Sequence, residues 1–232
     1  MINYQNIAII TARKGSRRIK NKNLKNFFGK PVIYYSIENL KKTKLFDEII
    51  VTTNCNKIAK TSLKYGVSKI IKRPRSLSNN SVGTLRVVKH SIKKLEKLNI
   101  FPKFICCVYP AAPLIRYQNI NYAYKKIKRI QKGFVYPSTV IKEKAKNLKI
   151  VKRLVKPEKI NVREGIINEL FLDAGQFWFA KTTTWKKLKT VFTKNSYTFP
   201  IKEEFSDINS IGDWKKVIKI FKKNKKKLFV LN

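Results

Sequence analysis

The sequence predicts an α/β fold, with a Rossmann-like, mostly parallel sheet flanked by helices, and two observations carry this prediction. Short apolar runs alternate with helix-length segments over most of the 232 residues, which is typical of strand–helix–strand units. One run, residues 104–109, is apolar throughout, as expected of a strand at the centre of a parallel sheet. A chain of this length is expected to form one domain, over residues 1–232.

The individual elements follow from the pattern in order along the chain. Apolar runs predict strands at residues 7–10, 48–53, 69–71, 104–109, 134–136 and 177–180. Apolar residues at helical spacing predict helices at about residues 31–40, 57–65, 85–95, 119–130 and 214–221. Pro31 suits the first turn of a helix, and Gly66 is expected to end the second helix because glycine readily takes the left-handed conformation found there.

Residues 138–172 break this alternation of strands and helices. Lysines alternate there with aliphatic residues, and helical periodicity is weak. We therefore expect an inserted arm within the single domain, packed on something other than the sheet. A second copy of the chain would offer such a surface, so the sequence predicts a homodimer.

The chain is strongly basic: 53 lysines and arginines stand against 13 aspartates and glutamates, a formal charge of +40. One interpretation is a polyanion partner such as nucleic acid, and the other is a lysine-rich surface without a specific partner. Clustered charge marks a nucleic-acid interface, whereas lysines occur here in nearly every segment. We therefore expect no specific nucleic-acid partner, and a basic nucleic-acid-binding protein stays as the alternative class.

The three cysteines, Cys55, Cys106 and Cys107, show neither metal-ligand spacing nor a disulfide framework. Cys106 and Cys107 lie in an apolar run and are expected to be buried thiols in a reducing compartment. The longest apolar stretch, residues 104–115, is shorter than the ~18 residues that span a bilayer. Because residues 1–10 do not resemble a signal peptide, we expect a cytoplasmic protein without membrane insertion.

A cluster of cations follows the first predicted strand directly. In open α/β sheets ligands bind at the carboxyl ends of the strands, which is where this segment begins. Gly15 allows a ligand to approach the backbone closely, Ser16 offers a donor, and Arg13, Arg17 and Lys22 supply charge-assisted bonds to phosphate. Neither the Walker pattern nor G-x-G-x-x-G is present. From these residues alone, a phosphate-binding loop and a solvated basic loop both remain open.

A longer comparison distinguishes these two interpretations. Residues 9–23, Ile-Ile-Thr-Ala-Arg-Lys-Gly-Ser-Arg-Arg-Ile-Lys-Asn-Lys-Asn, resemble the signature loop of the acylneuraminate cytidylyltransferase family, and the family's Gly-Lys-Pro follows at residues 29–31. The resemblance continues through residues 46–53, 73–74 and 83–84 and covers essentially the whole chain. It implies transfer of CMP from CTP to the anomeric hydroxyl of a nine-carbon acidic sugar, with release of pyrophosphate.

Two stretches, residues 106–113 and 173–178, resemble the branch of this family that activates pseudaminic acid for surface glycans. Relatives that act on sialic acid usually carry Gln-Pro-x-Ser-Pro where residues 109–113 stand here. The implied reaction is therefore CTP plus pseudaminic acid giving CMP-pseudaminic acid and pyrophosphate. Activation of another acidic sugar (N-acetylneuraminic, legionaminic or 3-deoxy-manno-octulosonic acid) remains the alternative.

The resemblance also implies roles, position by position. The implied catalytic residues are Arg13, Lys22 and Asp207. The implied nucleotide-binding residues are Ala12, Arg13, Gly15, Ser16, Lys22, Asn23, Arg73 and Thr84. The implied sugar-binding residues are Tyr109, Arg163, Asp173 and Gln176. Among these, Arg163 is expected to meet the sugar carboxylate, because a planar guanidinium matches that group better than an ammonium does.

The expected Mg²⁺ position departs from the family pattern. The family carries Asp-Ile-Asp-Thr ahead of Asp-Trp, whereas this chain has Asp-Ile-Asn-Ser at residues 207–210 ahead of Asp-Trp at residues 213–214. We expect Asp207 and Asn209 to bind Mg²⁺, or alternatively Mn²⁺, more weakly than two carboxylates would. Asparagines at positions 54, 79 and 80 likewise stand where relatives often carry acidic residues. A working enzyme with one weakened metal position is expected, and a catalytically weakened homologue is the alternative.

The sequence does not identify the group that accepts the proton of the sugar hydroxyl. The only histidine, His90, lies off the apolar stripe of its predicted helix and is expected at the surface. A carboxylate, a metal-bound hydroxide and water all remain open.

Overall fold

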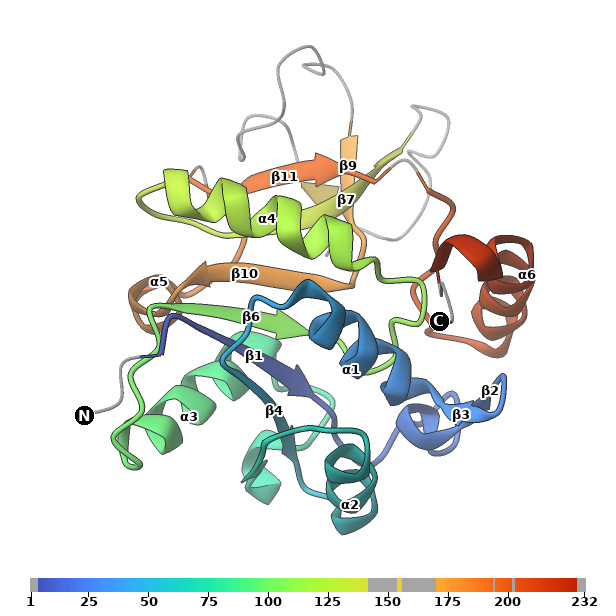
Figure 1. Ribbon diagram of the computed structural model, residues 1–232, viewed down its shortest axis with the longest axis horizontal. Coiled ribbons are helices and arrows are strands. Elements are labelled where there is room, and N and C mark those ends of the chain that lie inside the picture. Colours follow the sequence, from blue (N-terminus) through green and yellow to red (C-terminus); the bar gives the residue numbers. More distant parts are fainter. Residues whose placement is uncertain (1–3, 142–153, 156–169, 194, 202, 229–232) are drawn as a thin grey trace.

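The computed structural model describes residues 4–141, 154–155, 170–193, 195–201 and 203–228. Nine strands of this part of the chain form one sheet, in the order β5-β4-β1-β6-β10-β7-β9-β8, with β11 also paired to β7 (Figure 1). Four neighbouring strands run parallel: β5 (Lys69–Lys72), β4 (Glu48–Thr53), β1 (Asn6–Thr11) and β6 (Phe104–Val108). These four are the apolar runs that the sequence predicts, so the α/β class is confirmed. Cys106 and Cys107 are buried in β6, also as predicted.

The other end of the sheet is mainly antiparallel. β10 (Phe177–Lys181) runs antiparallel to β6 and to β7 (Val135–Ile141). β9 (Leu170–Asp173) and β8 (Leu154–Val155) continue the antiparallel order, while β11 (Tyr197–Pro200) is parallel to β7. The sheet is therefore mixed, and the cationic segment after β1 lies at the end of its parallel half.

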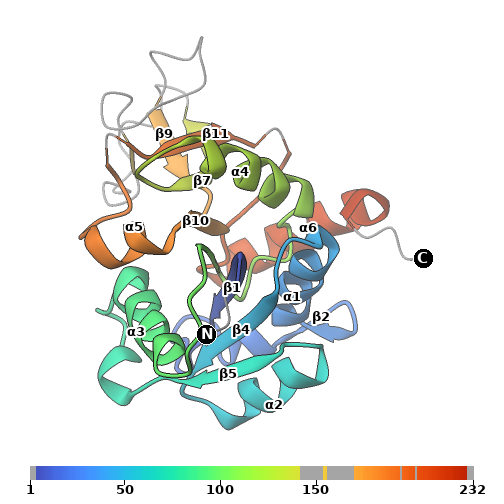
Figure 2. The same ribbon diagram turned by 60° about the vertical axis from the view of Figure 1, so that its left-hand side comes forward.

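Helices cover both faces of this sheet (Figure 2). One apolar core joins it to α1 (Val32–Thr43), α2 (Asn56–Lys64) and α4 (Tyr117–Arg129). A second core, on the other face, joins it to α3 (Thr84–Glu96) and α5 (Thr182–Lys187). The predicted stripes are buried in these cores, as at Ile37 of α1 and Ile92 of α3. Hydrophobic burial on both faces thus fixes the ends of β1 and β6, on which the site is built.

A third core joins residues 19–35, after β1, to residues 205–221. α6 (Ile211–Leu228) packs on a small hairpin of β2 (Asn26–Phe27) and β3 (Lys30–Pro31), beside the short helix η1 (Lys22–Leu24). The ring of Phe27 meets that of Phe221 edge to face, with centroids 4.9 Å apart. Ile19 and Ile208 are buried in the same core. The third core therefore holds the segment after β1 against the segment before α6.

The predicted arm at residues 138–172 is corrected in its described part. Residues 138–141, 154–155 and 170–172 are strands of the main sheet, so this part of the predicted arm belongs to the sheet itself. These segments read Ser-Thr-Val-Ile, Leu-Val and Leu-Phe-Leu, and their β-branched and apolar residues suit strands, which explains the difference. The rest of the arm lies outside the described residues. α5, β11 and the hairpin β2–β3 were not predicted from the sequence.

Among the helices that the structure describes, none combines the length and the apolar character needed to cross a membrane.

Candidate active site

The topology opens a crevice where β1 and β6 end. From β1 the chain moves to β4 and β5 on one side, then returns to β6 on the other side. The loops that leave β1 and β6 therefore diverge, which is where open α/β sheets bind ligands. Residues 12–22, the basic loop, follow β1, and Tyr109 follows β6. Several cavities meet at this crevice, and Lys22 borders each of them.

The first cavity, of about 190 Å³, brings together most of the predicted nucleotide-binding residues. Of these, its wall contains Arg13, Ser16, Lys22, Asn23, Arg73 and Thr84. Ala12 is buried in the first apolar core and does not line the cavity, and Gly15 borders a small adjoining space of about 20 Å³. Gly15 has φ +93°, a left-handed conformation that favours glycine. Residues from separate loops thus converge on one cavity, as expected of a nucleotide site.

Arg73 is a buried cation in this wall, only 5% exposed. One guanidinium nitrogen donates to the backbone oxygen of Thr52 at 2.8 Å, while Nε has no hydrogen-bond partner in the part of the chain that the structure describes. Burial lowers the pKa of Arg73 to about 10, and Cys107 opposes this while Arg13 adds to it. A buried N–H group without an acceptor costs free energy. A ligand that supplies an acceptor to the Nε–H of Arg73 would therefore be favoured.

The basic loop is held by contacts within this crevice. Asn23 is buried and donates from Nδ2 to the backbone oxygen of Arg13 at 3.0 Å. Arg13 donates to the backbone oxygen of Gly15 at 2.9 Å. Partial burial, and next the neighbouring Arg17, lower the pKa of Arg13. Positive charges held close together in this way favour an anionic ligand.

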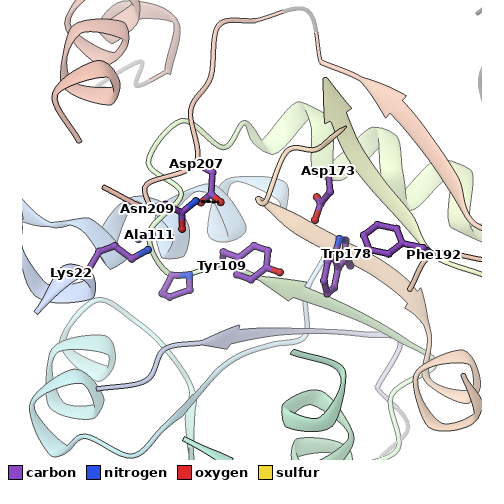
Figure 3. A pocket seen from close by; sticks show the side chains of 9 residues that line it. Lys22, Tyr109, Ala111, Asp173, Trp178, Phe192, Asp207 and Asn209 are labelled. Atoms are coloured by element: carbon purple, nitrogen blue, oxygen red, sulfur yellow. Dashed lines mark hydrogen bonds between the residues drawn. The ribbon is translucent and has the colours of Figure 1, made fainter. Parts of the chain in front are cut away.

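The second cavity, of about 400 Å³, adjoins the first and carries carboxylates (Figure 3). Its lining consists of Lys22, Tyr109, Pro110, Ala111, Asp173, Trp178, Phe192, Asp207 and Asn209. Lys22, Asp207 and Asn209 gather at one end, Asp173, Trp178 and Phe192 at the other, and Tyr109 lies between them (Figure 3). The cavity thus has a charged end next to the nucleotide cavity and a largely aromatic far end.

Two of the predicted sugar-binding residues line this second cavity. Tyr109 packs edge to face against Trp178, with ring centroids 5.7 Å apart. Asp173 is 2% exposed and accepts a hydrogen bond from the backbone nitrogen of Gly175 at 2.9 Å. Gln176 is buried but does not line the cavity; its backbone oxygen accepts from the backbone nitrogen of Tyr109. Arg163, the remaining predicted residue, lies outside the described residues.

Trp178 and Phe192 were not predicted to act in the site. Trp178 is 9% exposed, and its buried indole Nε1–H has no hydrogen-bond partner among the described residues. Phe192 packs against Trp178 edge to face, with centroids 6.3 Å apart. Trp178 appeared in the sequence as one apolar residue of a strand, and no pattern distinguished Phe192. Only the fold places them together.

Lys22 connects the cavities and bonds to the chain before α6. Its Nζ donates to the backbone oxygen of Ile208 at 2.5 Å. Burial lowers the pKa of Lys22; the nearby Asp207 opposes this effect, while Arg18 and Arg13 add to it. An ammonium in this position is suited to an anion that reaches from one cavity to the next.

A third cavity, of about 430 Å³, lies along the outer side of the basic loop. It is lined by Arg13, Ser16, Arg17, Arg18, Ile19, Lys22, Asn80 and Asn209. Four of these side chains are cations, and the lining contains no carboxylate in the part of the chain that the structure describes. Such a wall is suited to a polyphosphate.

The predicted metal ligands lie beside each other at the charged end of the second cavity. Asn209 donates from Nδ2 to Asp207 Oδ2 at 2.7 Å, and its Oδ1 accepts from Arg18 at 3.2 Å. Within the described residues, no group of three or more His, Cys, Asp and Glu side chains is arranged to hold a metal. One carboxylate fits Mg²⁺ when ligand phosphates complete its coordination, which is how Mg²⁺ is commonly bound.

A switch-point crevice with a cationic loop, a nucleotide-sized cavity and an adjoining carboxylate-bearing cavity defines a nucleotidyltransferase. The chain belongs to the cytidylyltransferase family, whose model matches residues 7–228. It is therefore a cytidylyltransferase, the class that the sequence predicts.

Individual relatives agree with this family. A pseudaminic acid cytidylyltransferase of Campylobacter jejuni is 29% identical over 97% of this chain and 100% of its own length. A CMP-N,N'-diacetyllegionaminic acid synthase of Legionella pneumophila is 26% identical over 96% of this chain and 98% of its own. The fold is similar to that of a CMP:2-keto-3-deoxy-manno-octonic acid synthetase complexed with CTP, with a TM-score of 0.72, 13% identity and coverage of 95% and 99% of the two chains.

Proposed function

We propose that this cytidylyltransferase transfers CMP from CTP to the anomeric hydroxyl of pseudaminic acid, giving CMP-pseudaminic acid and pyrophosphate. The observation that carries the proposal is the pair of adjoining cavities that share Lys22, one lined by the predicted nucleotide-binding residues and one by carboxylates and aromatic rings. The Campylobacter jejuni relative, similar over its full length, supports pseudaminic acid as the sugar.

The first cavity is proposed to hold the cytidine of CTP. Arg73 offers an unpaired Nε–H there, and Thr84 and Asn23 are neighbouring polar groups. The phosphates would then extend past Ser16 and Lys22 along the basic loop. This path brings the α-phosphate to the junction of the cavities.

Catalysis on this proposal is mainly positioning and charge stabilisation. The sugar hydroxyl oxygen attacks the α-phosphorus and gives up its proton to the solvent. A new P–O bond forms, and the bond from the α-phosphorus to the bridging oxygen of the β-phosphate breaks to release pyrophosphate. Lys22 and Arg13 would stabilise the negative charge that develops on the leaving pyrophosphate. Lys22 is fixed for this role by its hydrogen bond to Ile208.

We also propose that Mg²⁺ (or Mn²⁺) takes part, bound by Asp207 together with phosphate oxygens. When bound, the ion would neutralise phosphate charge. Asp207 lies on the wall of the second cavity, next to Lys22, which supports the assignment. The amide oxygen of Asn209 accepts a hydrogen bond from Arg18, and it could bind the ion only after that bond is broken. Asn209 would therefore be a weaker metal ligand than Asp207.

The second cavity is proposed to hold the acidic sugar. Trp178 and Phe192 offer an aromatic surface there, and the buried indole N–H of Trp178, which has no partner among the described residues, would gain one from an acceptor of the sugar. An N-acyl group combines a carbonyl acceptor with a methyl group, which fits this pair. Arg163 remains the predicted partner of the sugar carboxylate, and Gln176, which is buried and not part of the cavity lining, remains a predicted sugar ligand.

Legionaminic acid is the second candidate for the sugar substrate, because the Legionella pneumophila relative is also similar over its full length.

We further propose that the protein is cytoplasmic and forms a homodimer. Light scattering of the purified protein tests the dimer.

The experiment is to measure pyrophosphate release from CTP and Mg²⁺ with pseudaminic, legionaminic or N-acetylneuraminic acid. Release chiefly with pseudaminic acid is expected, and a Lys22→Met variant should lose it. Release chiefly with another of the sugars would replace the sugar assignment and keep the reaction. Lack of release with all three, from a folded protein that binds CTP, would refute the proposal.

A further inference from the structure

Three asparagines from separate segments bond to the basic loop through their amide oxygens. Asn54, after β4, accepts from the backbone nitrogen of Lys14 at 2.8 Å. Asn209, before α6, accepts from Arg18 at 3.2 Å, and Asn80, after the short helix η2 (Arg75–Leu77), accepts from Arg13. The loop is therefore held at three points by neutral acceptors.

A carboxylate in the same places would accept the same hydrogen bonds but would also neutralise the loop. Among the described residues, no ion pair with a carboxylate involves Arg13, Arg17 or Arg18. These arginines and Lys22 line the third cavity, and Asn80 and Asn209 are the acceptors that lie among them. The amides thus position the cations while leaving their charge available to a ligand.

We propose that Asn54, Asn80 and Asn209 are positioning residues that hold the basic loop in a polyphosphate-binding arrangement without neutralising it. This inference rests on the proposed function, because the polyphosphate would be the triphosphate of CTP. It adds that the protein's own cations bind polyphosphate even without a divalent ion.

Binding of inorganic tripolyphosphate in EDTA, measured by calorimetry over a range of salt concentrations, tests this inference. Asn80→Asp keeps the acceptor and adds a charge next to Arg13, whereas Asn80→Ala removes the acceptor without adding charge. Asn56→Asp is the matched control: Asn56 begins α2, is exposed, and makes no hydrogen bond to the loop in the described structure. All four proteins should fold, because both asparagines are exposed.

Asn80→Asp is expected to bind tripolyphosphate about fivefold more weakly than Asn56→Asp, with a shallower dependence on salt. Asn80→Ala should lose about twofold or less and keep the salt dependence of the wild-type protein, since the cations remain. The change in salt dependence separates a charge effect from a merely structural one.

Several outcomes would overturn the inference. One is equal affinity of Asn80→Asp and Asn56→Asp for tripolyphosphate. Another is an equal loss of affinity in Asn80→Asp and Asn80→Ala, with the salt dependence unchanged in both. The third is that the wild-type protein does not bind tripolyphosphate without a divalent ion. A wild-type protein that binds tripolyphosphate in EDTA but releases no pyrophosphate with any sugar would refute the proposed reaction and leave this inference standing.

Discussion

Lys22 donates a hydrogen bond from Nζ to the backbone oxygen of Ile208 at 2.5 Å, which ties the basic loop after β1 to the segment before α6. These two segments are more than 180 residues apart in sequence, and the third core holds them together through Ile19 and Ile208. As a result one ammonium borders the nucleotide cavity, the carboxylate-bearing cavity and the cationic cavity. Because the Lys22 ammonium borders all three cavities, its removal should lower the reaction rate more than the stability of the fold.

Lys22→Met is expected to lower kcat about 10²–10³-fold, the usual loss when a fixed donor to developing charge is removed. Methionine keeps most of the aliphatic stem, so the melting temperature should change little. Pyrophosphate release and thermal unfolding measure the two quantities. A variant with near wild-type kcat would show that Lys22 has no part in the chemical step.

The pH dependence of kcat/KM for CTP should fall at alkaline pH because of Lys22. Burial favours the neutral amine and lowers the pKa, so the cation is lost on raising the pH before the ordinary value of 10.5 is reached. Lys22→Arg keeps the charge at these pH values and should move the decline to higher pH. The same alkaline decline in Lys22→Arg would assign it to another group.

Asn209→Asp is expected to raise the affinity for Mn²⁺ about tenfold, because a second carboxylate joins Asp207. Without metal, the variant should be less stable by ~1 kcal/mol or less, since a hydrogen bond of 2.7 Å is replaced by two like charges while the neighbouring Arg18 offsets part of the repulsion. Electron paramagnetic resonance of free Mn²⁺ and thermal unfolding with and without Mn²⁺ check both effects. Equal Mn²⁺ affinity in the two proteins would place the metal elsewhere.

The parallel half of the sheet could be predicted because buried strands are read directly from apolar runs such as residues 104–108. The hairpin β2–β3 has strands of two residues each, too short for any periodicity to appear. α5 reads Thr-Thr-Thr-Trp-Lys-Lys, in which Trp185 is the single large apolar residue on the buried side. Its helix is therefore fixed by packing on the sheet rather than by local pattern.

The site could be predicted only as far as sequence neighbours determine it. The charges of the basic loop left two interpretations open, and the family resemblance, rather than the charges, indicated phosphate. Asn54, Asn80 and Asn209 stood out as departures from an acidic pattern, but their common partner is visible only in the fold. The pairing of Trp178 with Phe192 likewise depends on tertiary contacts.

Trp178→Phe tests the far end of the sugar cavity. The substitution keeps an aromatic ring against Tyr109 and Phe192 but removes the unpaired Nε1–H. KM for the sugar should rise about tenfold, the value of one hydrogen bond, while KM for CTP stays unchanged. Steady-state kinetics with each substrate varied in turn provide the measurement. A parallel rise in both KM values would indicate a general change of the fold instead.

Gly133→Ala should destabilise the fold strongly, and the reason lies where β7 and β11 begin. Gly133 has φ +96°, and a Cβ there would lie 2.0 Å from the backbone oxygen of Asn195, an atom that cannot move aside as a flexible side chain would. The neighbouring backbone bond from Tyr197 to Phe134, at 2.7 Å, would have to open to relieve the clash. We expect a loss of about 3 kcal/mol or more in the free energy of unfolding, combining left-handed strain with overpacking.

Gly66→Ala is the matched control, since Gly66 has φ +89° but its Cβ would meet only the Lys41 side chain at 3.6 Å. The free energy of unfolding of Gly66→Ala, measured by urea denaturation, should fall by about 1 kcal/mol. Equal losses in the two variants would show that backbone strain alone accounts for both.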